Sequence, residues 1–301
     1  MTESVAVVVV THNRADLLRR MLDGLAAQTR PPDAVYVVDN ASSDHTRAVL
    51  ESRPDLPLRV THSTENLGGA GGFHLGVEQA YRAGHDRIWL MDDDVVPAPD
   101  CLAVLVQHDE SCLMAVREDR EGRLVEKAAV HFDLRRPHAV RPKRSSVESV
   151  YATRAALPER VQIENVAFEG FMVHRRVIDV IGLPDPAYFI FYDDVDFAVR
   201  ARRAGFRIWA VRDAVLVRQL AFDQQHALDT WKGFYMYRNL FLVHFRHGEN
   251  TLVRAKPYAI AAAVVALSPW RGGRAEAHNV IRAIRAARAM PRDAGGQTSP
   301  R

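Results

Sequence analysis

Ile88-Trp-Leu-Met-Asp92-Asp93-Asp94 is a short apolar run that leads directly into three consecutive aspartates. The apolar part has the length and composition of a buried strand. Neighbouring carboxylates repel one another, and a fold offsets that repulsion with a divalent cation or another positive charge. The stretch therefore predicts a metal site at the end of a strand, and the alternative is an acidic turn that water solvates.

The segments before this stretch alternate between strand and helix patterns. Nearly continuous apolar runs predict strands at residues 5–10, 35–38, 58–61 and 87–91. Helical spacing of apolar residues, with Asn13 as a cap of the first helix, predicts helices near residues 17–25, after Ser42 or Ser43, and at 72–83. This order predicts an α/β fold with a Rossmann-like, mostly parallel sheet flanked by helices.

Polar residues fall where the predicted strands end, which is where open α/β sheets bind their ligands. They are Thr11, Asp39, Asn66 and the three aspartates. A dinucleotide site is not indicated, because the turn after the first strand has no glycine and the glycine run at 68–72 is followed by His74 where a third glycine would be needed. That run lets a ligand approach the backbone closely, or it is only a flexible helix entry.

A second acidic cluster, Asp193-Asp194-Val-Asp196, follows the aromatic run Tyr188-Phe-Ile-Phe-Tyr192. An aromatic wall beside a carboxylate raises its pKa by removing water, which suits it to take a proton from an incoming hydroxyl. The alternative is that Asp193 or Asp194 caps the following helix. One acidic cluster for a metal and one for a base is the division that the sequence favours.

The composition is typical of a soluble globular protein, with 301 residues of which 48% are hydrophobic and 26% are charged. No apolar run reaches the roughly 20 residues that span a bilayer, and the N-terminus lacks the basic start of a signal peptide. We therefore expect a cytoplasmic protein. The formal net charge of +3 is too small to indicate a nucleic-acid partner, so none is expected.

The last part of the chain, residues 246–301, is predicted to be a basic helical extension with a disordered end at 295–301. Arg282, Arg285 and Arg288 are spaced so that they form a cationic face on an amphipathic helix. This face is either a solvated surface or a contact with an anionic membrane, which would place the protein at the inner face of the cell membrane.

Taken together, the motifs resemble those of family 2 inverting glycosyltransferases of the GT-A fold. The resemblance covers about residues 5–215 and rests on Thr11-His-Asn13-Arg14, Asp39-Asn40-Ala-Ser42-Ser-Asp44, Asn66-Leu-Gly68-Gly69-Ala-Gly71-Gly72, Asp92-Asp93-Asp94 and Phe191-Tyr-Asp193-Asp194-Val-Asp196. The glycine-rich motif, the Asp triplet and the later Tyr235-Met-Tyr237-Arg238-Asn239 are most similar to bacterial galactofuranosyl and rhamnosyl transferases that extend polyprenyl-linked glycans.

The resemblance implies a GT-A domain over residues 1–245, with a nucleotide-binding half at about 1–117 and an acceptor half at about 160–245. It implies a UDP- or dTDP-sugar donor bound by Thr11, Asn13, Arg14, Asp39, Asn66, Gly69, Asp92 and Asp93. Asp94 would coordinate Mg²⁺ or Mn²⁺ and Asp194 would be the general base. Candidates for holding the acceptor or a phosphate are Asp193, Arg218, Tyr237 and Arg238, with packing as the alternative for the last two.

One position departs from the family pattern. Relatives commonly carry a metal-ligating histidine about two dozen residues after the base, where this chain has Arg218, and the nearest histidine is His226. An arginine cannot bind a cation, although it can hold a diphosphate. The sequence thus favours a glycosyltransferase with a lipid-linked or glycan acceptor. The alternatives are a sugar nucleotidyltransferase and a module that binds a nucleotide sugar without turnover.

Overall fold

The structure is a computed structural model, and it describes residues 3–139, 142–220, 228, 230–270 and 273–291. Its main sheet has the strand order β3-β2-β1-β4-β10-β6-β11-β5, with β9 paired to β11. The strands are β1 Val5–Thr11, β2 Ala34–Asp39, β3 Leu58–His62, β4 Arg87–Asp92, β5 Val95–Pro97, β6 Cys112–Glu118, β9 Arg160–Ile163, β10 Phe171–His174 and β11 Ile208–Arg218. A separate two-stranded sheet consists of β7 Ala129–Phe132 and β8 Lys143–Ser146.

The sheet is parallel from β3 to β4, and β11 is also parallel to β6. Between these two parallel parts, β10 runs antiparallel to both β4 and β6. The predicted α/β fold with a mostly parallel sheet is therefore confirmed. The insertion of β10 beside β4 brings a segment from late in the chain next to the Asp triplet.

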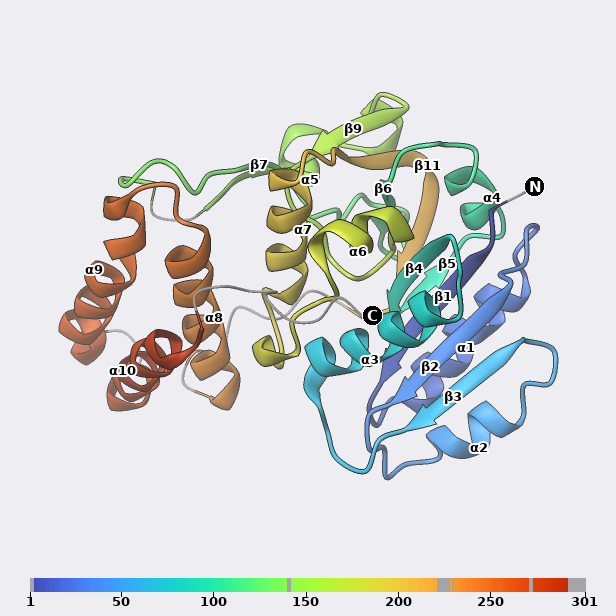
Figure 1. Ribbon diagram of the computed structural model, residues 1–301, viewed down its shortest axis with the longest axis horizontal. Coiled ribbons are helices and arrows are strands. Elements are labelled where there is room, and N and C mark those ends of the chain that lie inside the picture. The colour runs from blue at the N-terminus through green and yellow to red at the C-terminus, as the bar shows by residue number, and fades with distance from the viewer. Residues whose placement is uncertain (1–2, 140–141, 221–227, 229, 271–272, 292–301) are drawn as a thin grey trace.

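Helices cover both faces of the sheet (Figure 1). They are α1 Ala15–Ala26, α2 Thr46–Glu51, α3 Gly68–Arg82, α4 Cys101–Leu105, α5 Val147–Val150, α6 Arg175–Ile181 and α7 Asp193–Arg203, followed by α8 Trp231–His247, α9 Thr251–Leu267 and α10 Gly273–Ala289. Every residue of β1 is buried. Its odd-numbered valines pack with α1, and Val8 and Val10 pack in the cluster that contains α3 and α7. Burial on both faces explains why the strand reads as a continuous apolar run.

Two glycines allow α3 to lie close to β1. A Cβ at Gly72 would come within 2.5 Å of Val10, and one at Gly76 would come within 2.5 Å of Val8. The glycines are four residues apart and therefore lie on the same side of the helix. Part of the glycine-rich stretch is thus explained by helix–sheet packing.

Some local expectations are wrong. Asn13 does not cap α1, because the helix has no side-chain cap and the N–H of Ala15 donates to Asp44 Oδ2 at 3.0 Å. The backbone of Asn13 instead has a φ of 53°, which turns the chain before the helix. The third helix begins at Gly68, four residues earlier than predicted, so the glycine run forms its first turn.

The helices α8, α9 and α10 pack against one another in their own hydrophobic cluster, which also includes Tyr188 and Val199. They form the end of the molecule opposite α1 and α2 (Figure 1). Among the residues that the structure describes, no helix is both long and apolar enough to cross a membrane. The end predicted to be disordered, 295–301, lies outside the described residues.

Candidate active site

Polar side chains at the carboxyl ends of β1 and β2 tie the adjoining loops together. Asp39 accepts a hydrogen bond from Ser42 N at 3.0 Å, and its Oδ2 lies 2.8 Å from His62 Nδ1. Asn13 Oδ1 accepts from Ser43 N at 2.7 Å, which links the loop after β1 to the loop after β2. These residues lie at the edge of the sheet where the sequence predicts the nucleotide.

The predicted diphosphate residues lie beside this edge, at the start of α3. Asn66 Oδ1 accepts from Gly68 N at 2.8 Å and from Asn40 Nδ2 at 3.0 Å. Asn40 belongs to the sequence motif but had no predicted role. Its side chain also accepts a hydrogen bond from Leu67 N and donates one to Gly68 O. A Cβ at Gly69 would have no neighbour within 4 Å, so this glycine faces open space.

The Asp triplet meets a cation from the loop after β1. Arg14 Nη1 donates to Asp93 Oδ1 at 3.0 Å, and Thr11 Oγ1 donates to Asp93 Oδ2 at 2.8 Å. Both oxygens of Asp93, which is 3% exposed, therefore have protein donors. Arg14 therefore supplies part of the positive charge that was expected to offset the repulsion among these carboxylates.

Asp94 differs from Asp93 in keeping one oxygen without a protein donor. Its Oδ2 lies 3.6 Å from Arg14 and 3.9 Å from Arg218, whereas its buried Oδ1 accepts no hydrogen bond from the described residues. Burial and the charge of Glu169 raise the pKa of Asp94 to about 6. Such an oxygen fits a divalent cation, and Mg²⁺ is commonly held by one or two carboxylates together with substrate phosphates. Within the described ranges, no group of three His, Cys, Asp or Glu side chains is arranged to hold an ion.

Glu169 shares Arg218 with Asp94, and no sequence motif indicated it. Arg117 Nη1 donates to Glu169 Oε2 at 2.7 Å, and Arg218 Nε lies 3.3 Å from the same oxygen. Burial by itself would raise the pKa of Glu169, but Arg117 and Arg218 hold it below its usual value. The charge of Glu169 in turn contributes to the raised pKa of Asp94 and of Asp194. Both acidic clusters of the sequence therefore converge on Glu169.

The sequence offered only a weak signal for this residue. Glu169 is a single carboxylate before Gly170, whose φ of 102° marks a sharp turn into β10. Its importance depends on the position of β10 between β4 and β6. Arg218, at the end of β11, reaches both Glu169 and Asp94 as described above, whereas His226 lies outside the described residues.

The second acidic cluster begins α7, and burial raises the pKa of its first two carboxyl groups to different extents. Burial raises the pKa of Asp193 to about 8 and that of Asp194 to about 6. The hydrogen bond from Val195 N and the charge of Lys143 favour the ionised form of Asp194. Burial therefore disfavours ionisation of Asp193 more than that of Asp194, and Asp194 is the better candidate for the carboxylate that accepts a proton. Neither aspartate is the helix cap, which is Tyr192.

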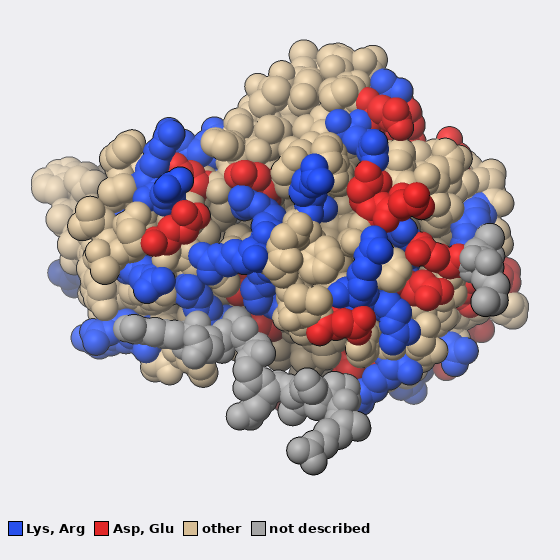
Figure 2. Space-filling model, turned by 45° about the horizontal axis from the view of Figure 1, so that its top comes forward, with Lys and Arg blue, Asp and Glu red and all other residues tan. Residues whose placement is uncertain are grey.

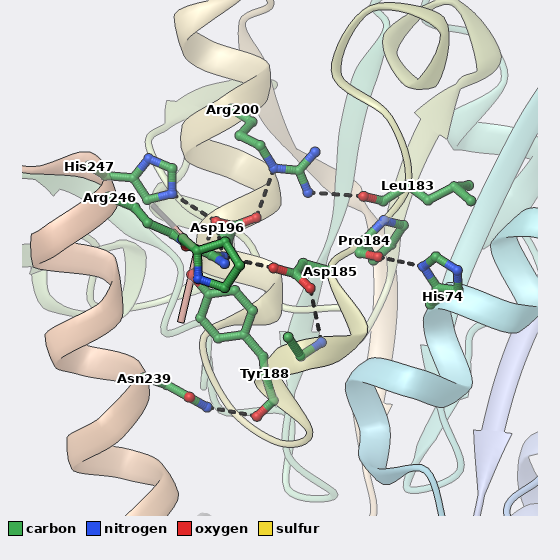
Figure 3. A network of polar contacts seen from close by, with 12 residues as sticks. His74, Leu183, Pro184, Asp185, Tyr188, Asp196, Arg200, Asn239, Arg246 and His247 are labelled. Atoms are coloured by element: carbon green, nitrogen blue, oxygen red, sulfur yellow. Dashed lines mark hydrogen bonds and ion pairs between the residues drawn. The ribbon is translucent and has the colours of Figure 1, made fainter. Parts of the chain in front are cut away.

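The loop that presents these aspartates has an unusual backbone. Phe189, Phe191 and Tyr192 have φ values of 62°, 67° and 68°, a region that residues other than glycine seldom occupy. The fully buried Asn239 of α8 holds this loop, because its Nδ2 lies 2.7 to 2.9 Å from three loop carbonyls, those of Tyr188, Ile190 and Phe191. The bond to Tyr188 is drawn in Figure 3.

Two other residues of α8, predicted as acceptor candidates with packing as the alternative, have structural contacts. Arg238 Nη2 donates to the carbonyls of Ala187 and Tyr188 at 2.8 and 2.7 Å. The hydroxyl of Tyr237 donates to Glu276 of α10 at 2.5 Å. Arg238 therefore helps to fix the loop, and Tyr237 connects α8 to α10.

Comparison with known proteins adds to this geometry. The family model described as glycosyltransferase like family 2 matches residues 3–234. The galactofuranosyltransferase GlfT1 of Mycobacterium tuberculosis is 35% identical over 254 residues, which is 79% of this chain and 81% of that protein. The GlfT1 of Mycolicibacterium smegmatis is 32% identical over 252 residues, with 79% and 82% covered.

Solved structures share the fold at low sequence identity. The mannosyltransferase PcManGT from Pyrobaculum calidifontis, in complex with GDP-Man and Mn²⁺, has a TM-score of 0.56 and 21% identity, covering 95% of this chain and 86% of that chain. GalNAc-T7 with UDP, GalNAc and Mn²⁺ has a TM-score of 0.66 and 15% identity, covering 94% and 54%. Because the family model matches most of the chain and the curated relatives are more than 30% identical, this protein belongs to glycosyltransferase family 2 and is a glycosyltransferase of the GT-A fold.

Proposed function

We propose that the protein transfers a sugar from a UDP- or dTDP-sugar to a hydroxyl of a lipid-linked or glycan acceptor in cell-envelope polysaccharide synthesis, with inversion at the anomeric carbon. Galactofuranose is favoured over rhamnose, because the similar curated proteins are galactofuranosyltransferases. The observation that carries the proposal is the interaction of Glu169 with both acidic clusters, because it shares Arg218 with Asp94 and its charge contributes to the raised pKa of Asp194. One cluster is paired with arginines, and the other contains an ionised carboxylate of raised pKa.

The donor is assigned to the edge of the sheet near β1 and β2. Thr11, Asn13 and Asp39 would hold the base and ribose, Asn66 and Gly69 would lie along the diphosphate, and Asp92 and Asp93 would face the ribose or sugar. Arg14 supports this assignment, because its guanidinium reaches Asp93 and lies 45% exposed where a diphosphate could share it. Guanidinium groups bind phosphate oxygens in two parallel hydrogen bonds.

Asp94 would hold Mg²⁺ or Mn²⁺. The ion would stabilise the negative charge of the departing nucleoside diphosphate. The free oxygen of Asp94 supports this role. Arg218 adds positive charge at the same carboxylate, and we assign it to the diphosphate rather than to the acceptor.

Asp194 would take the proton of the acceptor hydroxyl while that oxygen attacks the face of the sugar opposite the diphosphate. The acceptor would approach from the loop at 188–192 and the first turn of α8, where Trp231 is 57% exposed and close to Phe189 and Tyr235. A lipid-linked acceptor would place the enzyme at the inner face of the cell membrane.

The test compares transfer from UDP-galactofuranose and dTDP-rhamnose to a short synthetic lipid-linked glycan, with mass spectrometry of the product and NMR of its anomeric configuration. Asp194→Asn should lower kcat by about 10² to 10⁴-fold and leave UDP affinity nearly unchanged. Asp193→Asn is the matched control, and it should lose much less because burial disfavours the ionised form of Asp193 more strongly than that of Asp194. Equal losses of kcat in both variants would show that Asp194 is not the general base. UDP binding without any transfer by the wild-type chain would indicate a binding module.

A further inference from the structure

The solvent side of α9 is apolar. No charged residue occurs from Pro257 to Trp270. Large apolar side chains of α9 and the following turn η4 Ser268–Trp270 are exposed, with Trp270 at 80%, Leu252 at 64% and others at Tyr258, Val265 and Leu267. A surface helix of a globular protein normally carries polar residues on the side that faces water. We call these five side chains the α9 face.

The large side chains of the α9 face are exposed and are not part of the buried core. Val253, Ala261 and Val264 of α9 are buried, and Tyr258 of the α9 face also packs against Phe245 of α8 and Arg288 of α10. The helix lies at the end of the molecule farthest from α1 and α2 (Figure 1). A contiguous apolar surface of this kind marks a contact with a membrane or with another protein.

The exposed charges of the described residues between 251 and 290 are positive, and the exposed Glu249 lies just before this segment. Between Thr251 and Met290 the only acidic residue is Glu276, which is buried and bonded to Tyr237. Among the described residues of this segment, the exposed charged side chains are those of Arg254, Arg274, Arg282, Arg285 and Arg288. In Figure 2 the far left end of the molecule is mostly uncharged, and basic side chains with some acidic ones lie at its border.

Two of these arginines adjoin the α9 face directly. Arg285 and Arg288 line an open groove of about 510 Å³ between α9 and α10 whose other walls are Tyr258, Ile284 and Ala289. The guanidinium of Arg288 lies 5.9 Å from the ring centre of Tyr258. Apolar walls beside two guanidinium groups match a phospholipid, which has acyl chains next to a phosphate.

We propose that the α9 face rests on an anionic phospholipid membrane, with Trp270, Leu267 and Val265 among the acyl chains near the headgroups and with Arg285 and Arg288 on lipid phosphates. A second copy of the chain fits less well, because two surfaces with the same basic border would repel one another. The helix lies in the plane of the membrane surface and does not cross it. The proposal deepens the proposed function by giving a lipid-linked acceptor a route to the enzyme, but its physical basis is independent of that function.

The experiment measures binding of the purified full chain to vesicles of phosphatidylcholine with and without phosphatidylglycerol. Val265→Ser combined with Leu267→Ser should raise the vesicle Kd at least tenfold, as should Arg285→Gln combined with Arg288→Gln. Matched controls are Val180→Ser, on the exposed side of α6, and Arg82→Gln, on the surface of α3. Both controls should bind as the wild-type chain does, and added salt should weaken the wild-type binding.

A second readout locates the contact. In a Trp231→Phe chain, Trp270 is the only strongly exposed tryptophan among the described residues, since Trp89 is buried and Trp209 is partly buried. Lipids brominated on their acyl chains should quench the fluorescence of this variant, and the further change Trp270→Phe should abolish most of the quenching.

The proposal is overturned if phosphatidylglycerol vesicles bind no better than phosphatidylcholine vesicles, or if the control variants lose as much binding as the α9 variants. It is also overturned if sedimentation shows a dimer that the Val265→Ser and Leu267→Ser changes dissociate. Transfer to a water-soluble acceptor separates the two hypotheses. Membrane binding without transfer would refute the proposed function only, and transfer without membrane binding would refute the α9 contact only.

Discussion

The two neighbouring carboxyl groups at the start of α7 show how burial distributes chemical roles. Asp193 and Asp194 share the helix and the loop, yet their pKa values are raised to about 8 and about 6. The difference favours Asp194 as the proton acceptor, because a base must be ionised at the working pH.

The raised pKa of Asp194 predicts a pH profile. Activity requires the ionised form, so kcat/KM should be nearly constant above pH 7 and should fall about tenfold per pH unit below pH 6. Transfer rates measured at saturating metal in buffers of constant ionic strength check this. A profile that stays flat down to pH 4.5 would mean that no carboxyl of raised pKa acts as the base.

Arg218 should make nucleotide binding less dependent on metal. Its guanidinium lies 3.9 Å from Asp94 and 3.3 Å from Glu169, where it can share the charge of a diphosphate. In calorimetric titrations with UDP, we expect EDTA to weaken binding by a larger factor in Arg218→Gln than in the wild-type chain. Arg212→Gln, an exposed arginine of β11 paired with Asp213, is the control and should respond as the wild-type chain does. Equal responses of all three chains would show that Arg218 does not bind the diphosphate.

At the scale of single elements, the start of α3 depends on one glycine. Gly68 has a φ of 71°, and a Cβ there would lie 2.1 Å from the carbonyl oxygen of Phe189 in the loop before Asp194. The predicted donor and acceptor sides of the site therefore touch at this position through backbone atoms.

Gly68→Ala should lower the free energy of unfolding by about 1 to 3 kcal/mol. It combines an unfavourable φ with a clash against the backbone of Phe189, which lies in the loop that the three hydrogen bonds of Asn239 hold in place. Gly69→Ala is the matched control: it has open space, and we expect a change within about 1 kcal/mol that can be stabilising. Urea unfolding followed by circular dichroism gives both values, and similar losses would mean that Phe189 moves aside freely.

Across the whole molecule, Asp196 joins α7 to the C-terminal helices (Figure 3). Its carboxylate, fully buried, accepts hydrogen bonds from Arg200 Nε at 2.8 Å, from the hydroxyl of Tyr188 at 3.1 Å and from His247 Nε2 at 2.7 Å. Burial would raise the pKa of Asp196, but His247 and Arg200 outweigh it and lower the pKa to about 2.

A lowered pKa in the folded state means that the ionised form stabilises the fold. This contribution is complete above the ordinary aspartate pKa near 4 and disappears as the pH falls toward 2. By linkage it amounts to about 2 kcal/mol. Asp196→Asn should therefore be less stable than the wild-type chain at pH 6, and the difference should shrink between pH 4 and pH 2. A difference in melting temperature that is the same at all pH values would contradict this account.

Much of the fold and part of the site follow from local sequence. The strand of residues 5–11 is readable because burial on both faces demands an unbroken apolar run. The order of strands and helices places Thr11, Asp39, Asn66 and the Asp triplet at one edge, because parallel strands end on the same side of a sheet. Local pattern also identified the aromatic loop and the aspartates after it. The local pattern wrongly predicted Asn13 as the cap of α1. In the fold, Asp44 accepts the hydrogen bond from Ala15 N at the start of the helix, and Asn13 accepts one from Ser43 N instead.

The sequence by itself determined the alternation of strands and helices, the two acidic clusters and the family, because each is written in periodicity or in contiguous residues. Tertiary structure alone decided that β10 enters between β4 and β6, so that Glu169 links the two clusters. It also separated the pKa values of Asp193 and Asp194 and left the α9 face exposed. The physical reason is that burial and charge–charge interactions depend on distance in space, and residues far apart in the chain set both.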